Sequence, residues 1–214
     1  MPITEKAVLF DVDGTLVDSN YQHVTCWVRA LDEVGHPVPA WRIHRCLGMD
    51  SSRLLDELLG DAKEELGDRA KELHADYYKE VAGDLNPLPG ARELLKHLRE
   101  AGHTIVLATS APEDELDILR AVLDVDDALH AVTNADDVET AKPEPDILMV
   151  ALERAGVAAD DAVMVGDSQW DLVAAERSGI RSIGVLCGGI GRDVLDAAGA
   201  SETHDDPAAL LASL

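Results

Sequence analysis

The chain has 214 residues, 46% of them apolar, which is enough to build a buried core and excludes a disordered chain. Its 42 acidic and 18 basic residues give a formal net charge of −24, which fits a solvated surface or adaptation to high salt and repels nucleic acid and anionic membrane surfaces. No apolar run approaches the ~18 residues of a membrane helix, and because the N-terminus has no signal-peptide layout we expect a cytoplasmic protein.

Five short apolar segments are predicted as strands of a parallel sheet, because they are rich in Val, Ile and Leu and lack the polar alternation of a half-exposed strand. They are residues 6–10, 104–109, 130–133, 162–166 and 181–186. Amphipathic helical segments lie between the later strands, with apolar side chains at helical spacing. Strands that alternate with helices predict a doubly wound α/β fold.

Two carboxylates, Asp11 and Asp13, directly follow the first predicted strand. Their spacing of two residues places both side chains on one side of an extended chain, and Gly14 lets the chain turn away. Neighbouring carboxylates repel each other unless a cation or a shared proton compensates the charge. Solvated turn acids would also give this pattern, whereas a calcium loop would need Gly where Leu16 stands.

Residues 17–86 interrupt the alternation of strands and helices with four helical segments. Pro and Gly in residues 86–90 mark the return to the α/β pattern. We therefore predict a core domain of residues 1–16 and 87–214 and an inserted all-helical cap domain of residues 17–86. Open α/β sheets bind ligands at the carboxyl ends of their strands, where this insertion begins, so the cap is placed to act as a lid.

Polar side chains also follow later strands of the predicted sheet. They are Thr109 and Ser110, Lys142 before Pro143, and Asp167 with Asp171. Pro143 is predicted to open the helix that follows Lys142, since proline suits the first helical position. Because the carboxyl ends of parallel strands share one edge of a sheet, we expect all these side chains to converge with Asp11 and Asp13.

With these motifs in this order, the chain resembles the haloacid dehalogenase superfamily. Within it, the chain is similar to the phosphatase branch with a helical cap, typified by phosphoglycolate phosphatases and β-phosphoglucomutases. The resemblance covers essentially the whole chain. It implies a Rossmann-like core and a magnesium-dependent phosphatase that hydrolyses a small phosphorylated metabolite, either a sugar phosphate or a phosphoglycolate-like acid, through an aspartyl-phosphate intermediate.

Three other functions use related residues. A sugar phosphomutase of the same family is the main alternative. A phospho-aspartate signalling receiver fits less well, because receivers lack the helical lid and a general acid two residues after the phosphorylated aspartate. A haloacid dehalogenase also fits less well, since such enzymes typically lack the second aspartate, which stands here as Asp13.

The resemblance implies roles for the acidic residues at the strand ends. Asp11 is the expected nucleophile, and Asp13 is the expected general acid and base. Mg²⁺ is the expected cofactor, bound by the side chains of Asp11 and Asp167 and by the backbone carbonyl of Asp13. Such an all-oxygen set, completed by water and the substrate phosphate, suits a hard cation.

The remaining core residues of the resemblance bind the phosphoryl group. Thr109 and Ser110 offer a hydroxyl and backbone N–H groups to its oxygens, and Lys142 supplies a positive charge. Asp171 is expected to orient Lys142 or the water around the metal rather than to bind the metal directly.

The predicted cap supplies the candidates for substrate selection. His23 stands where phosphomutases of the family, and also many of its phosphatases, carry a histidine; a helix histidine that is merely packed or solvated is the other interpretation. Arg45, Asp50 and Arg53 belong to the one stretch in which basic residues outnumber acidic ones. An ordinary helix–helix connection would explain them equally well.

The glycines of residues 188–191 lack the spacing of a dinucleotide or phosphate loop, so we expect no site there.

Overall fold

The structure is a computed structural model that describes residues 3–138, 140 and 142–214. Residues 1 and 2 of the predicted core segment, and residues 139 and 141, lie outside this description. A parallel six-stranded sheet forms the centre, with the strand order β3-β2-β1-β4-β5-β6. The strands are β1 (Ala7–Phe10), β2 (Thr104–Ala108), β3 (Ala131–Thr133), β4 (Ala162–Gly166), β5 (Arg181–Val185) and β6 (Ala200–His204).

The doubly wound α/β fold is confirmed, and the five predicted strands agree with β1–β5 to within one residue at either end. The sixth strand, β6, was not predicted. It lies at the edge of the sheet, pairs only with β5, and its residues are partly exposed. Its sequence contains Ser, Glu, Thr and His, so it carries no apolar run that would identify it.

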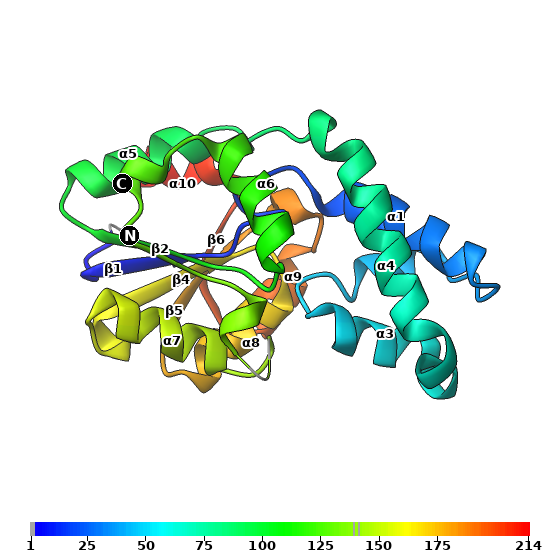
Figure 1. The fold of residues 1–214 in the computed structure, drawn as a ribbon. Coiled ribbons are helices and arrows are strands. Elements are labelled where there is room, and N and C mark those ends of the chain that lie inside the picture. The colour runs from blue at the N-terminus through cyan, green and yellow to red at the C-terminus, as the bar shows by residue number, and fades with distance from the viewer. Residues whose placement is uncertain (1–2, 139, 141) are drawn as a thin grey trace.

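Helices cover both faces of the sheet, and α1–α4 lie beyond one end of it (Figure 1). The helices are α1 (Asn20–Glu33), α2 (Ala40–His44), α3 (Ser51–Leu59), α4 (Lys63–Val81), α5 (Ala91–Glu100), α6 (Glu113–Leu123), α7 (Asp146–Ala155), α8 (Gln169–Arg177), α9 (Arg192–Ala197) and α10 (Pro207–Ser213). Short 3₁₀ helices occupy Gly60–Ala62, Ala82–Asp84, Asp126–Ala128, Ala135–Asp137, Ala159–Asp161 and Leu186–Gly188. Within the described residues, no helix is both long enough and apolar enough to cross a bilayer.

The two faces of β1 belong to two separate hydrophobic clusters. Val8 and Phe10 pack in the cluster that contains the leucines of α5 and α6, whereas Ala7 and Leu9 pack in the cluster that contains α7 and α8. All four side chains are fully buried. A strand that is buried on both faces needs apolar residues at every position, which explains the continuous apolar run.

Helices α1–α4 have a third hydrophobic cluster of their own, in which Trp27, Leu31 and Ile43 are almost completely buried. Two chain segments connect these helices to the sheet, and the segments run beside each other. The N–H of Asp18 donates to the carbonyl of Asn86 at 2.9 Å, and the N–H of Leu88 donates to the carbonyl of Leu16 at 2.9 Å. The division into domains at 16/17 and 86/87 stays a prediction, and this pairing lies at both of its boundaries.

The helix after Lys142 begins later than the sequence analysis predicted. Pro143 was expected at its first position, but α7 begins at Asp146 and Pro145 is its N-cap. The carbonyl of Pro145 accepts the first helical hydrogen bonds, from the N–H groups of Leu148 and Met149. Lys142 therefore lies in a turn and not at the entry of a helix.

Replacing Leu31 with alanine tests the separate cluster of α1–α4. Leu31 is fully buried, so the truncation leaves a cavity and is expected to lower the free energy of unfolding by about 2–5 kcal/mol. Urea denaturation measures this. The matched control is Val194→Ala on the exposed side of α9, which is expected to change stability by less than about 0.5 kcal/mol. Equal stability of the two variants would contradict a packed cluster in this part of the chain.

Candidate active site

Strands β1 and β4 are neighbours in the sheet, and the remaining strands are added on opposite sides of this pair. Strands β2 and β3 extend it to one side of β1, and β4–β6 extend it to the other. Asp11 follows β1 directly, and Asp167 follows β4 directly. The N–H of Asp11 donates to the carbonyl of Val165 at 3.0 Å, which keeps the two strand ends together. The two carboxylates thus lie at the switch point where open α/β sheets bind ligands.

A fully buried ammonium group, that of Lys142, lies behind Asp11. Its Nζ is 2.6 Å from Asp11 Oδ1, 2.7 Å from Asp171 Oδ1 and 2.7 Å from the carbonyl oxygen of Ala108. These acceptors match its three N–H donors. Burial alone would lower the pKa of Lys142, but the charges of Asp11 and Asp171 outweigh it and raise that pKa, so the ammonium is protonated.

Asp171 is held by the first turn of α8. Its Oδ2 accepts hydrogen bonds from the N–H of Ser168 at 3.1 Å and from the hydroxyl of Ser168 at 2.6 Å, as part of a capping box. Its Oδ1 contacts Lys142. Because both carboxylate oxygens of Asp171 are engaged, this side chain orients Lys142 and has little capacity left for a metal ion.

The pKa values of the two carboxylates at the switch point are raised. Burial, with a smaller contribution from the charge of Asp171, raises the pKa of Asp167 to about 7. The same two causes hold the pKa of Asp11 well above its usual range, although Lys142 opposes them. Thr15 and Asn20 donate hydrogen bonds to Asp167 at 3.0 and 2.9 Å, which orients its two oxygens.

This cluster of carboxylates fits a divalent cation. One oxygen each of Asp11, Asp167 and Asp171 lies within 4.8 Å of the others, and all three residues are buried. Lys142 balances only one of these negative charges, so the site has an excess of buried carboxylate. Carboxylate oxygens are the ligands that hard cations such as Mg²⁺ prefer, and Asp11 and Asp167 are the pair free to supply them.

Four polar side chains contact one another in succession, as a chain from Asp13 after β1 through a histidine on α1 and a histidine on α4 to a glutamate on α6. Asp13 Oδ1 accepts from the hydroxyl of Ser19 at 2.5 Å and lies 3.2 Å from His23 Nε2 on α1. His23 Nδ1 is 3.0 Å from His74 Nε2 on α4. His74 Nδ1 lies 3.7 Å from Glu115 Oε1 on α6.

The protonation of this chain follows from its electrostatics. Burial opposes the charged forms of Asp13 and His23, but their mutual hydrogen bond outweighs it, lowering the pKa of Asp13 and raising that of His23. Burial and the charge of His23 hold the pKa of His74 well below its usual range. A charged His23 therefore donates from both nitrogens, to Asp13 and to a neutral His74.

Aromatic side chains hold both imidazole rings in place. His23 stacks on Tyr78 with ring centroids 4.1 Å apart, and His74 stacks on Trp27 at the same distance. The stacking fixes the planes of the two rings, so their nitrogens stay directed along the chain from Asp13 to Glu115.

A cavity of about 200 Å³ lies between the carboxyl edge of the sheet and helices α1, α3 and α4. Six of the site residues expected from the sequence line it: Asp11, Asp13, His23, Thr109, Ser110 and Asp167. Thr109 is fixed at the end of β2, where its N–H donates to the carbonyl of Thr133 at 3.2 Å. Lys142 and Asp171 lie behind Asp11 and contact it or each other. The structure thus brings all the expected core residues to one place.

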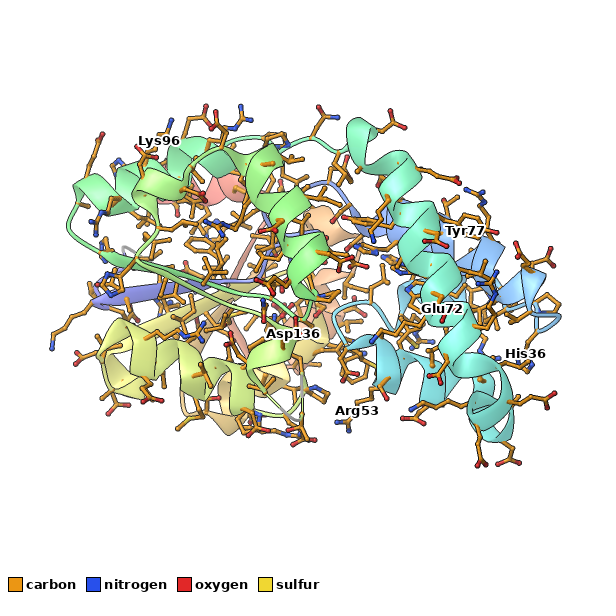
Figure 2. All side chains as sticks on the ribbon, viewed as in Figure 1. His36, Arg53, Glu72, Tyr77, Lys96 and Asp136 are labelled. Atoms are coloured by element: carbon orange, nitrogen blue, oxygen red, sulfur yellow. The ribbon has the colours of Figure 1, made fainter. Side chains whose placement is uncertain are left out.

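The structure does not bring Arg45, Asp50 and Arg53 to this cavity. Asp50 caps α3 by accepting the N–H groups of Ser52 and Arg53 at 2.8 and 3.1 Å. Arg53 forms an ion pair with Glu144 at 3.1 Å, and Figure 2 shows its side chain at the lower margin of the molecule, where α3 faces the core. Arg45 is exposed. Charged residues in this stretch cap a helix or join the surfaces of cap and core, and Gly48, Met49 and Ser51 line the cavity in their place.

Gly188 lies beside the cluster of carboxylates, although the glycines of residues 188–191 are not expected to form a dinucleotide or phosphate loop. Its carbonyl accepts hydrogen bonds from Asn20 Nδ2 at 3.1 Å and from His44 Nε2 at 2.9 Å. A Cβ on Gly188 would overlap the carboxylate of Asp167. The sequence signal that could have indicated this position is the pair Gly188 and Gly189, which closely follows the predicted strand of residues 181–186. His74 and Glu115 have no local signal, because only the folded chain brings them together.

Comparisons with known proteins agree with this arrangement. Residues 8–185 match the family model of haloacid dehalogenase-like hydrolases. A phosphoglycolate phosphatase of Pseudomonas putida is 29% identical over 96% of this chain and 78% of its own. A phosphorylated carbohydrates phosphatase of Thermotoga maritima is 30% identical over 83% of each chain. The crystal structure of a hydrolase from Pseudomonas syringae is similar with a TM-score of 0.93 and 36% identity, over 98% of this chain and 97% of that one.

The variant Gly188→Ala tests how closely the backbone must approach Asp167. The added methyl group has to displace the Asp167 carboxylate, so we expect a loss of activity of at least about tenfold with a folded protein. Activity and thermal melting are measured together. Gly83→Ala is the control, because a Cβ on Gly83 meets no atom within 4 Å. Full activity of Gly188→Ala would show that the position of Asp167 is not critical.

Proposed function

The chain belongs to the haloacid dehalogenase-like hydrolase family and is a phosphatase of that family, and from this premise we propose a magnesium-dependent hydrolysis of a small phosphorylated metabolite through an aspartyl-phosphate on Asp11. The observation that carries the proposal is the placement of Asp11. Its carboxylate lies at the base of the cavity, one oxygen is held by Lys142, and a second carboxylate, that of Asp13, lines the same cavity.

The first step is the attack of Asp11 on the phosphorus atom. The ammonium of Lys142 orients the Asp11 carboxylate and favours its ionised form, in opposition to burial and the neighbouring carboxylates, which raise its pKa. The hydroxyls of Thr109 and Ser110, which line the same cavity, are the groups expected to bind the phosphoryl oxygens. The P–O bond to the alcohol breaks as the bond to Asp11 forms, which divides one difficult hydrolysis into two easier steps.

Asp13 handles the proton in both steps. It delivers a proton to the oxygen of the leaving alcohol, and it later removes a proton from the water that attacks the aspartyl-phosphate. Its neighbour His23 is the group that keeps a proton beside it, at 3.2 Å. Ser19, at 2.5 Å, restricts the rotation of the Asp13 carboxylate.

The side chains of Asp11 and Asp167, together with the backbone carbonyl of Asp13, are the proposed ligands of Mg²⁺. When bound, the cation supplies positive charge that offsets the clustered carboxylates and stabilises the charge on the transferred phosphoryl group. Thr15 and Asn20 orient Asp167 for this role through their hydrogen bonds.

A sugar phosphomutase is the second candidate, and the contact between His23 and Asp13 favours it as well, because a mutase must also move a proton at the substrate hydroxyl. Release of inorganic phosphate without an isomeric product distinguishes the phosphatase. The substrate of the phosphatase is a sugar phosphate or a phosphoglycolate-like acid.

Asp11→Asn is expected to abolish phosphate release, because the amide cannot form the aspartyl-phosphate. The fold is expected to remain, with a melting temperature equal to or above that of the wild type. The substitution neutralises one of several crowded carboxylates, and Lys142 keeps its ion pair with Asp171. A phosphate-release assay with an aryl phosphate and thermal melting test this. Asp32→Asn, at an exposed position of α1, is the control and should be as active as the wild type. Substantial turnover by Asp11→Asn would exclude Asp11 as the nucleophile.

Chelation of divalent ions is expected to stop turnover, and Mg²⁺ is expected to restore it. Ca²⁺ should restore little, because it prefers a larger and looser shell of oxygen ligands. Mg²⁺ should also raise the melting temperature by binding only the folded chain, and Asp167→Asn should remove that rise. Full activity with Ca²⁺ alone, or an unchanged Mg²⁺ response in Asp167→Asn, would contradict the proposed ligands.

A further inference from the structure

Helices α1, α3 and α4 and the segment before α3 contribute mainly apolar side chains to the end of the cavity away from the sheet. They include Trp27, Met49, Leu54 and Ala75. If the phosphate of a substrate binds beside Asp11, its alcohol part extends toward this end. The alcohol is therefore recognised by residues of α1, α3, α4 and α6, and not by the groups that perform the chemistry.

One buried charged side chain faces this end of the cavity. Glu115 lines the cavity, is only 7% exposed, and its Oε1 lies 3.7 Å from His74 Nδ1. Glu115 belongs to the first turn of α6, and its carboxylate contacts His74 of α4. Burial, with opposing effects of His23 and Asp13, raises the pKa of Glu115 to about 7.

The other charges near Glu115 do not turn this region into an anion site. Asp114 adds a second carboxylate to the lining, and Lys79 pairs with it at 2.9 Å on the exposed side of α6. Lys71 also lines the cavity, but it lies at an exposed position, where solvent screens its charge. Among the described lining residues there is no arginine, His74 is held neutral, and the charge of His23 is paired with Asp13.

Resting on the proposed phosphatase function, we propose that this cavity selects phosphate monoesters whose alcohol part carries no second anionic group, and that Glu115 is the residue that determines this selectivity. The Glu115 carboxylate accepts a hydrogen bond from a hydroxyl or ammonium group of the substrate. When Glu115 is ionised, a substrate carboxylate at the same place would face a buried negative charge without a cation between them. Like charges that are brought together away from water are strongly unfavourable, whereas a charged hydrogen bond is favourable.

The experiment uses substrates with one carbon skeleton and three different charges. They are 2-hydroxyethyl phosphate, phosphoethanolamine and phosphoglycolate, whose alcohol parts are neutral, cationic and anionic. Glycerol 3-phosphate and 3-phosphoglycerate are a longer pair, with a neutral and an anionic alcohol part. In the presence of Mg²⁺, we expect kcat/KM of the wild type to be at least about tenfold higher for the esters with a neutral or cationic alcohol part than for the esters with a carboxylate.

The variant Glu115→Gln keeps the size of the side chain and removes its charge. It is expected to reduce the preference for neutral over anionic substrates by about tenfold, mainly by raising kcat/KM for the carboxylates. Glu113→Gln is the matched control, because it is the same substitution on the same helix at an exposed position outside the cavity lining. The preference of Glu113→Gln for neutral over anionic substrates should equal that of the wild type. Glu115→Leu, a second uncharged variant, replaces Glu115→Gln if thermal melting shows the latter to be unfolded.

The possible outcomes separate this inference from the proposed function. If the wild type hydrolyses the carboxylate esters as well as or better than their neutral partners, the inference is wrong and the phosphatase function stands. If the preference exists but an uncharged residue at position 115 leaves it unchanged, Glu115 does not determine it. If neither these esters nor an aryl phosphate release phosphate with Mg²⁺, the proposed function itself fails.

Discussion

The position of one buried ammonium group constrains most of this structure. Lys142 contacts Asp11 after β1, Asp171 in the first turn of α8 after β4, and the carbonyl of Ala108 at the end of β2. Its three N–H donors thus connect the carboxyl ends of three adjacent strands. Complete removal of one of these acceptors would leave part of a buried charge unpaired and be strongly destabilising, although the network as a whole need not add stability relative to apolar packing. The network keeps Asp11 in a single orientation at the base of the cavity.

The sequence predicts this part of the molecule well because the relevant signals are local. The apolar runs of β1, β2 and β4 are directly followed by Asp11, Thr109 and Asp167, and the parallel topology alone brings those residues to one edge. Edge strand β6 lacks such a run, and Pro145, not Pro143, immediately precedes α7 as its N-cap. The excess of basic residues around Arg45 and Arg53 does not locate them relative to the cavity, since net charge does not tell which side of a helix meets it.

Residues of α1–α4 complete the site on the core. Asn20 donates to Asp167, His44 donates to the carbonyl of Gly188, and His23 contacts Asp13. These contacts join groups far apart in the sequence, so no local pattern reveals them. They also mean that a movement of α1 away from the sheet would release Asp167 and Asp13 together. The orientation of the catalytic groups and the exclusion of water from the cavity therefore depend on the same packing of helices.

That packing has opposite electrostatic consequences at the two ends of the cavity. At the sheet edge, burial places several carboxylates around one lysine, an arrangement that a divalent cation and the phosphate of a substrate can complete. At the far end, Glu115 is buried beside a neutral histidine, while the charge of His23 is paired with Asp13 and that of Lys71 is exposed to solvent. A molecule that fits both ends needs its negative charge concentrated on the phosphate. On this inference, the buried surroundings of Glu115 leave the phosphate as the one anionic group that the cavity accepts.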